Sequence, residues 1–172
     1  MRYFYAPWRQ THIKEVRERS IGGSGGDCLF CTQFLETDDA KNLILARTQH
    51  SVIMLNLYPY NAGHILILPL KHVGSIIDLS REEAHDIMSS LQTAATVLKQ
   101  VLQSEGINIG MNIGQAAGAS IPGHLHAHIL PRWIGDTNFL PLIAETKTIS
   151  IDMRDIYARL KPVFNAVMGE TV

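Results

Sequence analysis

The stretch GHLHAHILPRW, residues 123–133, places three histidines at alternate positions. Successive side chains of a β-strand point to opposite faces, so His124, His126 and His128 would share one face of a strand. A helix would spread the same three side chains around its axis. The spacing therefore predicts a strand over 124–131 with an apolar face in the core. Its imidazole face would be open or covered by a ligand.

The segments around this stretch alternate between strand and helix patterns. Ser80 and Glu83 form a capping box, which is typical of a helix start, and Gly106 would close the segment. Apolar residues follow the capping box at helical spacing: Ala84, Ile87, Met88, Leu91, Ala95, Leu98 and Leu102. The pattern predicts a long helix with one buried stripe.

The remaining elements predict an α+β fold. The segment 152–168 carries an apolar helical face and contains Pro162, which could bend the helix. Four further segments have strand character: 42–46, 51–57, 64–69 and 107–113. The first three of them resemble an antiparallel meander.

Composition and length limit the classes of function. A chain of 172 residues favours one domain, which we place at 28–172, after an N-terminal arm and Gly-rich hinge at 1–27. A net charge of −1 argues against nucleic-acid binding. The sequence has no apolar run of about 18 residues and no apolar signal core, so we expect a cytoplasmic protein without a membrane segment.

The histidine run admits three interpretations. Surface histidines could occur on an edge strand by chance, but three in register beside a Gly/Ser-containing loop make chance a poor explanation. A metal site within the run would need a further Glu or Asp-His ligand at the usual offsets, which is not found. Histidine is also a nucleophile and proton carrier near neutral pH, and this interpretation is favoured.

The run His124-Leu-His126-Ala-His128-Ile-Leu resembles the signature of the histidine triad (HIT) superfamily. The segment NLYPYNAGHILILPLKH, 56–72, is similar to the Gly-His strand of that family. The tail PRWIGDTNFLPLIAETK, 131–147, resembles the branch that contains diadenosine tetraphosphate phosphorylases, close to the fragile histidine triad hydrolases.

The resemblance implies a fold and an activity. The fold would be a five-stranded antiparallel half-barrel sheet with a long helix and a C-terminal helix, paired into a homodimer or a higher oligomer. The activity would be that of a nucleotidyl hydrolase or transferase that cleaves adenosine polyphosphates through a nucleotidyl-histidine intermediate. It could be of the ATP adenylyltransferase or the dinucleoside polyphosphate hydrolase type, with a phosphorylase favoured. A purine nucleoside phosphoramidate or dinucleotide hydrolase, or a zinc-stabilised nucleotide-binding module with little turnover, are the alternatives.

The resemblance also implies roles for three histidines. His126 would be the nucleophile, His128 would contact the α-phosphate and the leaving oxygen, and His64 would support the site. Covalent catalysis of this kind splits one displacement into two.

Further positions match nucleotide-binding residues of the family. Asn56 would contact the ribose, Asn112 the phosphate side, and Leu29 with Phe30 the base. In the loop 114–123, Gly118 and Ala119 would let backbone N–H groups approach the phosphate, and Ser120 would add a hydroxyl. If phosphate is the acceptor, Arg132 and Lys147 are candidate cations.

Cys28 and Cys31 could be redox-active, buried or metal-binding. A redox pair of the thioredoxin kind should open a helix after a strand, and this pair follows a Gly-rich hinge instead. The resemblance implies a structural zinc site made by Cys28, Cys31, His72 and His124. His124 would then position the site and would not transfer protons.

Overall fold

The computed structural model describes residues 28–138 and 152–169. The N-terminal arm and hinge at 1–27 therefore lie outside the described residues, as do the tail beyond Asn138 and Lys147 within it. The described elements follow the chain in the order α2 (Leu29–Leu35), β1 (Ile44–Arg47), β2 (Ser51–Leu55), β3 (Ile65–Pro69), η2 (Ile76–Asp78), α3 (Arg81–Leu102), β4 (Gly106–Met111), η3 (Gln115–Ala117), β5 (Ala127–Arg132) and α5 (Met153–Gly169).

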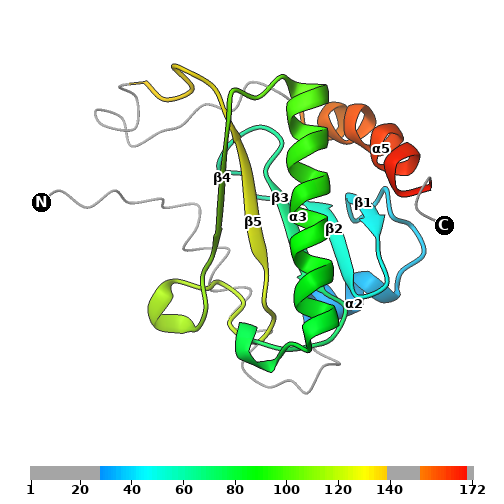
Figure 1. The fold of residues 1–172 in the computed structure, drawn as a ribbon, viewed down its shortest axis with the longest axis vertical. Helices are drawn as coiled ribbons and strands as arrows, with labels where there is room; N and C mark the ends of the chain where they lie inside the picture. The colour runs from blue at the N-terminus through cyan, green and yellow to red at the C-terminus, as the bar shows by residue number, and fades with distance from the viewer. Residues whose placement is uncertain (1–27, 139–151, 170–172) are drawn as a thin grey trace, which may run out of the picture.

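The strands form one antiparallel sheet in the order β1-β2-β3-β5-β4. This confirms the five-stranded antiparallel α+β fold and the meander of the first three strands. Strand β5 lies between β3 and β4, so the histidine run enters the middle of the sheet (Figure 1).

Helices α3 and α5 cover one face of the sheet (Figure 1). The main core lies between them and the sheet and includes Ile53, Ile67, Ile129, Leu98 and Phe164, all fully buried. Of the predicted stripe of α3, Ile87, Leu91 and Leu98 are buried and Ala95 and Leu102 are half-buried, but Ala84 and Met88 are exposed. Ala94 and Val97, which the pattern did not include, are buried.

The start of α3 matches the prediction, but its end does not. Helix α3 begins with the Ser80–Glu83 capping box, as predicted, but it ends at Leu102 with Gln103 in the left-handed conformation at φ 53°. Gly106 instead begins β4. Helix α5 runs from Met153 to Gly169 with Pro162 inside it.

A short helix that the sequence did not predict covers the other face of the sheet. Helix α2 begins directly after Cys28, and Phe30 on it packs into a second apolar cluster with Met54, Leu66 and Ile121. No side chain caps its N-terminus, so contacts with the sheet hold it.

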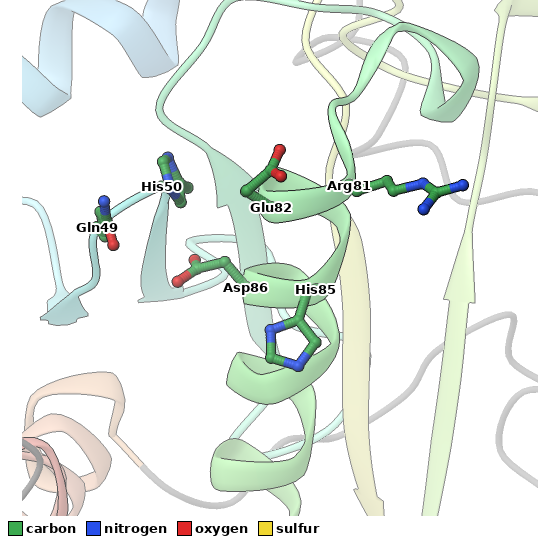
Figure 2. A pocket seen from close by; sticks show the side chains of 6 residues that line it. All are labelled: Gln49, His50, Arg81, Glu82, His85 and Asp86. Carbon is green, nitrogen blue, oxygen red and sulfur yellow. The ribbon is translucent and has the colours of Figure 1, made fainter.

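A pocket of about 470 Å³ lies where the β1–β2 turn meets the first turns of α3 (Figure 2). Its lining includes His50, His85 and Asp86, whose carboxylate accepts hydrogen bonds from Thr48 and Ser51. It lies on the α3 side of the sheet. These two histidines therefore belong to a different face from the predicted triad.

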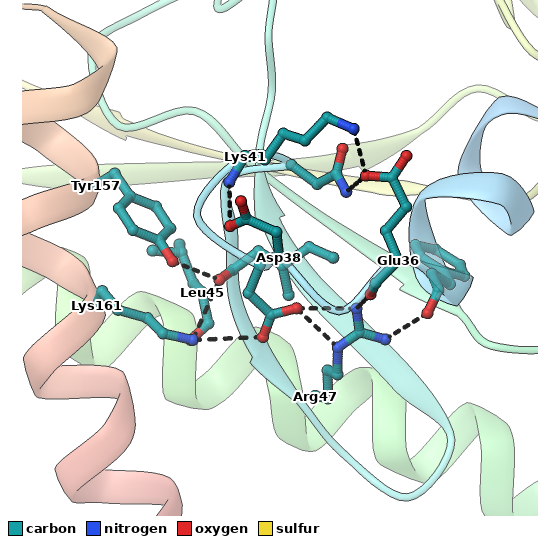
Figure 3. A network of polar contacts seen from close by, with 11 residues as sticks. Glu36, Asp38, Lys41, Leu45, Arg47, Tyr157 and Lys161 are labelled. Carbon is teal, nitrogen blue, oxygen red and sulfur yellow. Dashed lines mark hydrogen bonds and ion pairs between the residues drawn. The ribbon is translucent and has the colours of Figure 1, made fainter.

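Polar side chains of α5 cover the free edge of β1 (Figure 3). The Lys161 ammonium donates to the carbonyl oxygens of Ile44 and Leu45 at 3.2 and 3.0 Å, and the Tyr157 hydroxyl donates to that of Ile44 at 3.2 Å. Asp39 lies 3.7 Å from the Lys161 ammonium and also accepts from Arg47. Two carbonyl oxygens of this edge strand, those of Ile44 and Leu45, thus accept hydrogen bonds from side chains of α5.

No helix among the described residues is long and apolar enough to cross a membrane.

Candidate active site and metal centre

The histidine run reaches the site on an extended segment that becomes a strand only at Ala127, three residues later than predicted. The alternation holds nevertheless, because Ala127 and Ile129 lie in the main core while His128 pairs with Leu66 of the second cluster. The imidazole face is not open. His124, His126 and His128 are 0, 3 and 9% exposed, because α2 and the loop before β3 cover them.

The backbone fixes the tautomer of His126. Its Nδ1 lies 2.8 Å from the carbonyl oxygen of His124, which can only accept, so Nδ1 carries the proton. Nε2 then presents its lone pair, and within the described ranges it makes no hydrogen bond. Burial lowers the pKa of His126, which keeps the ring neutral.

Hydrogen bonds that pass through His64 fix the opposite tautomer of His128. The backbone N–H of Tyr60 donates to Nδ1 of His64 at 3.1 Å, and the Asn56 amide lies 3.2 Å from the same nitrogen. Neutral His64 therefore carries its proton on Nε2 and donates it to Nδ1 of His128 at 2.9 Å. In its neutral form His128 must then carry its own proton on Nε2.

Two neighbouring imidazoles thus present opposite chemistry. The rings of His126 and His128 lie 5.0 Å apart between centroids, at 71°. One offers a lone pair and the other an N–H donor. This is what an attack on phosphorus with a hydrogen bond to the leaving oxygen requires.

The four predicted metal ligands lie together. Two thiol sulfurs and two Nδ1 atoms, from Cys28, Cys31, His72 and His124, all lie within 4.8 Å of one another. The sulfur–nitrogen distances are 3.3, 3.4 and 3.6 Å. A tetrahedral zinc with ordinary bond lengths requires about 3.6 Å between a sulfur and a nitrogen ligand. The donor set therefore fits zinc.

Other groups prepare His124 and His72 for this role. His124 donates from Nε2 to the carbonyl oxygen of Pro69 at 2.9 Å, which leaves the Nδ1 lone pair directed at the sulfurs. Burial lowers the pKa of His124 to about 4, so the ring is neutral, as a ligand must be. A Cβ on Gly74 would lie 2.6 Å from the Pro122 carbonyl oxygen, and this close backbone approach brings His72 beside His124.

The cysteines do open a helix, contrary to the expectation. Cys28 is the N-cap of α2 and Cys31 its third residue, so the absence of a helix is no argument against redox chemistry. Burial, and then the neighbouring Cys28, raise the pKa of the Cys31 thiol to about 11. Without a metal this thiol would be protonated and unreactive near neutral pH.

Of the predicted nucleotide-binding residues, Phe30 and Asn56 contact the histidines directly. Phe30 is buried, with ring centroids 5.5 Å from His124 and 5.7 Å from His126, and Leu29 lies beside it on α2. The Asn56 amide contacts the His64 ring, and its oxygen accepts from the N–H of Tyr58 at 3.0 Å. Asn112 is half-buried just after β4.

The loop 114–123 contains η3 and two glycines with positive φ, Gly114 at 79° and Gly118 at 86°. The N–H groups of Gly118 and Ala119 bond within the loop, to the carbonyl oxygens of Gln115 and Gly114. These two N–H groups are therefore occupied, and the Ser120 side chain is half-buried.

Sequence reasoning missed Tyr60, Asn61 and Asp136. Tyr60 acts through its backbone N–H, which no residue pattern indicates. Asn61 and Asp136 are 75 positions apart and bond to each other at 2.9 Å. Arg132, a candidate phosphate ligand, is held by Asp136 and Asn108 instead.

Comparison with known proteins identifies the family. The model of the HIT domain matches residues 37–133. This chain belongs to the HIT family. An AP-4-A phosphorylase from Mycobacterium tuberculosis is 36% identical over 88% of this chain and 78% of its own length. A bis(5'-adenosyl)-triphosphatase from Saccharomyces cerevisiae is 32% identical over 61% of this chain and 49% of its own.

Solved structures support the fold of this HIT protein. A Zn-bound histidine triad family protein from Mycobacterium smegmatis superposes with a TM-score of 0.69 over 86% of this chain and 99% of that one, at 22% identity. A diadenosine triphosphate hydrolase from Plasmodium falciparum gives a TM-score of 0.59 over 92% and 97% of the two chains, at 18% identity.

Proposed function

We propose that this HIT protein cleaves adenosine-containing dinucleoside polyphosphates through a nucleotidyl intermediate on His126. The pair of opposite tautomers at His126 and His128 carries this proposal. The names of its relatives, AP-4-A phosphorylase and bis(5'-adenosyl)-triphosphatase, support the substrate class.

In the first step the Nε2 lone pair of His126 attacks the α-phosphorus. The bond from phosphorus to the bridging oxygen breaks, and the polyphosphate leaves as an anion whose oxygen accepts a hydrogen bond from Nε2–H of His128. In the second step an oxygen of the acceptor attacks phosphorus and the nitrogen–phosphorus bond breaks. An inorganic phosphate dianion keeps its own proton on another oxygen in this step. His126 keeps its Nδ1 proton throughout, on the His124 carbonyl.

We propose inorganic phosphate as the acceptor, on the basis of the 36% identical phosphorylase. Water is far more concentrated, so phosphate competes only if the enzyme binds and orients it. Arg132 does not serve as that site in the described arrangement, because its guanidinium is bound to Asp136 and Asn108.

The test is a product assay on diadenosine tetraphosphate with and without millimolar phosphate. Phosphorolysis gives ADP and ATP, whereas attack by water gives AMP and ATP. If phosphate changes neither the rate nor the AMP yield, the chain is a hydrolase. If no product forms, and no nucleotide is trapped on His126 after rapid acid quench, the proposed cleavage is wrong.

We also propose that Cys28, Cys31, His72 and His124 hold one structural zinc. When bound, the ion would link α2 to the residue whose carbonyl holds His126. The match between the sulfur–nitrogen distances and the tetrahedral requirement supports this assignment.

We further propose a homodimer joined through β4, in a cytoplasmic protein. Strand β4 ends the described sheet and carries Ile109, which is 54% exposed, with Ile113 just beyond it at 37%. A second copy pairing antiparallel along β4 would bury these side chains and satisfy the backbone groups of this edge.

A further inference from the structure

Asn61 lies outside the histidine cluster but connects to it through its backbone. It is 8% exposed, and its amide nitrogen donates to the Pro131 carbonyl oxygen at 3.0 Å and to Asp136 at 2.9 Å. Its own carbonyl oxygen accepts from the N–H of His64 at 3.1 Å. The side chain of Asn61 is therefore bonded to β5 and to the turn that follows it, and its backbone carbonyl is bonded to His64.

Asp136 is itself held firmly. Arg132 donates to both of its carboxylate oxygens, at 2.6 and 2.8 Å, and the N–H of Trp133 donates at 3.2 Å. Gly135, at φ 79°, lets the chain turn back so that these contacts form. The Asp136 side chain is only 7% exposed, so water competes little for these hydrogen bonds.

The residue next to Asn61 delivers the N–H that determines the proton position on His64. Tyr60 donates to Nδ1 of His64 only while the turn 58–63 keeps its shape, and Asn61 in this turn bonds to Pro131 of the sheet. A shift of the turn would remove the Tyr60 N–H and leave only the Asn56 amide on Nδ1, so His64 could more easily place its proton there and the donor toward His128 would be weakened.

We propose that Asn61, anchored by Asp136, is a positioning residue for the reaction, because it fixes the tautomers of His64 and His128. The catalytic part of this inference rests on the proposed function, whereas the tautomers do not. Under this proposal, the segment Arg-Trp-Ile-Gly-Asp, 132–136, orients the site through Asn61 and does not contact the substrate.

The first test reads the tautomers directly, by two-bond ¹H–¹⁵N NMR of the histidine side chains in zinc-loaded protein. The wild type should show the Nε2–H form for His64 and for neutral His128. Asn61→Ala should give a mixed or Nδ1–H signal for His64 while His126 keeps its Nδ1–H form. Asp136→Asn, which keeps the side-chain shape, should move His64 in the same direction and serves as the second variant if Asn61→Ala does not fold.

The second test separates positioning from general destabilisation. Asn61→Ala should lower kcat about tenfold with KM changed less than about twofold, since orientation is lost and binding is kept. In a His64→Ala background the same change should cost less than about twofold, because residues that act as one unit are not additive. Tyr157→Phe, which removes a hydrogen bond at the far edge of the sheet, is the control and should leave kcat unchanged.

An Nδ1–H form of His64 in the wild type, or unchanged tautomers in both folded variants, would overturn the inference. Equal loss of kcat in both backgrounds would also overturn it. If the wild type cleaves no dinucleotide, the proposed function fails, but the tautomers still decide the role of Asn61.

Discussion

At the scale of single residues, one hydrogen-bond partner gives two chemically identical imidazole rings opposite tautomers. His126 faces a carbonyl oxygen, and His128 faces the N–H of another imidazole. The residue types in the run were sufficient to predict that these rings share a face. The tautomers could not be predicted, because the partners that set them include backbone groups of Tyr60 and His124.

Replacing His126 with Ala should abolish nearly all turnover while nucleotide binding by equilibrium dialysis is largely kept, since only the attacking nitrogen is removed. A loss below about tenfold, or ~1.4 kcal/mol in barrier, would contradict the nucleophile assignment. His85→Ala is the matched control, because this histidine is exposed on the α3 side and should change nothing.

The Asp136 carboxylate should make stability depend on pH. The hydrogen bonds from Arg132 hold the pKa of Asp136 well below its ordinary value of 3.8. The folded state therefore binds this proton more weakly than the unfolded chain. The resulting stabilisation is fully present above about pH 4 and is lost as the pH falls through the lowered pKa.

Asp136→Asn should accordingly lower the free energy of unfolding by about 2 kcal/mol at pH 7, and the difference should shrink below pH 4. Urea denaturation of both proteins at pH 7, 5, 4 and 3 measures it. A difference that stays constant over this range would show that the charge of Asp136 contributes nothing.

At the scale of elements, a helix with a strong periodic pattern could be predicted, whereas the short helix α2 could not. The capping box and apolar stripe indicated α3 because 22 residues supply several turns of pattern. Helix α2 has seven residues and no side-chain cap, so its sequence carries little signal. Tertiary contacts form it: Phe30 packs on the histidines, and Arg47 donates to the Phe34 carbonyl oxygen at 2.8 Å.

Helix α2 should depend on the metal. Purified protein should contain about one zinc per chain, and Cys28→Ser should lower both zinc content and Tm, because metal binding is coupled to folding. Elemental analysis and thermal unfolding measure both quantities. Leu35→Ala, at an 86% exposed position of the same helix, should leave the zinc content unchanged. Zinc-free protein of unchanged stability and activity would return the cysteines to a buried-thiol role.

At the scale of the whole molecule, the two ends of the sheet differ. Strand β4 is an edge with exposed Ile109, whereas β1 is covered by α5. The alternating pattern at 107–113 predicted a strand, but sequence could not show that it ends the sheet, because strand order depends on pairings distant along the chain.

Ile109→Lys should convert a homodimer to a monomer, since a charge would be buried at the centre of the β4 pairing. Sedimentation equilibrium of the two proteins measures the mass. Ile77→Lys, at an 86% exposed position outside the sheet, should leave the dimer intact. A wild-type protein that sediments as a monomer would contradict the proposed pairing.

The covered edge of β1 also limits how far such pairing can proceed. Two copies joined through β4 would present only their β1 edges, and Lys161 and Tyr157 occupy the carbonyl oxygens of Ile44 on each. These contacts disfavour the addition of a further strand at the β1 edge. The C-terminal helix thus disfavours aggregation through this edge of the sheet, in addition to its part in the core.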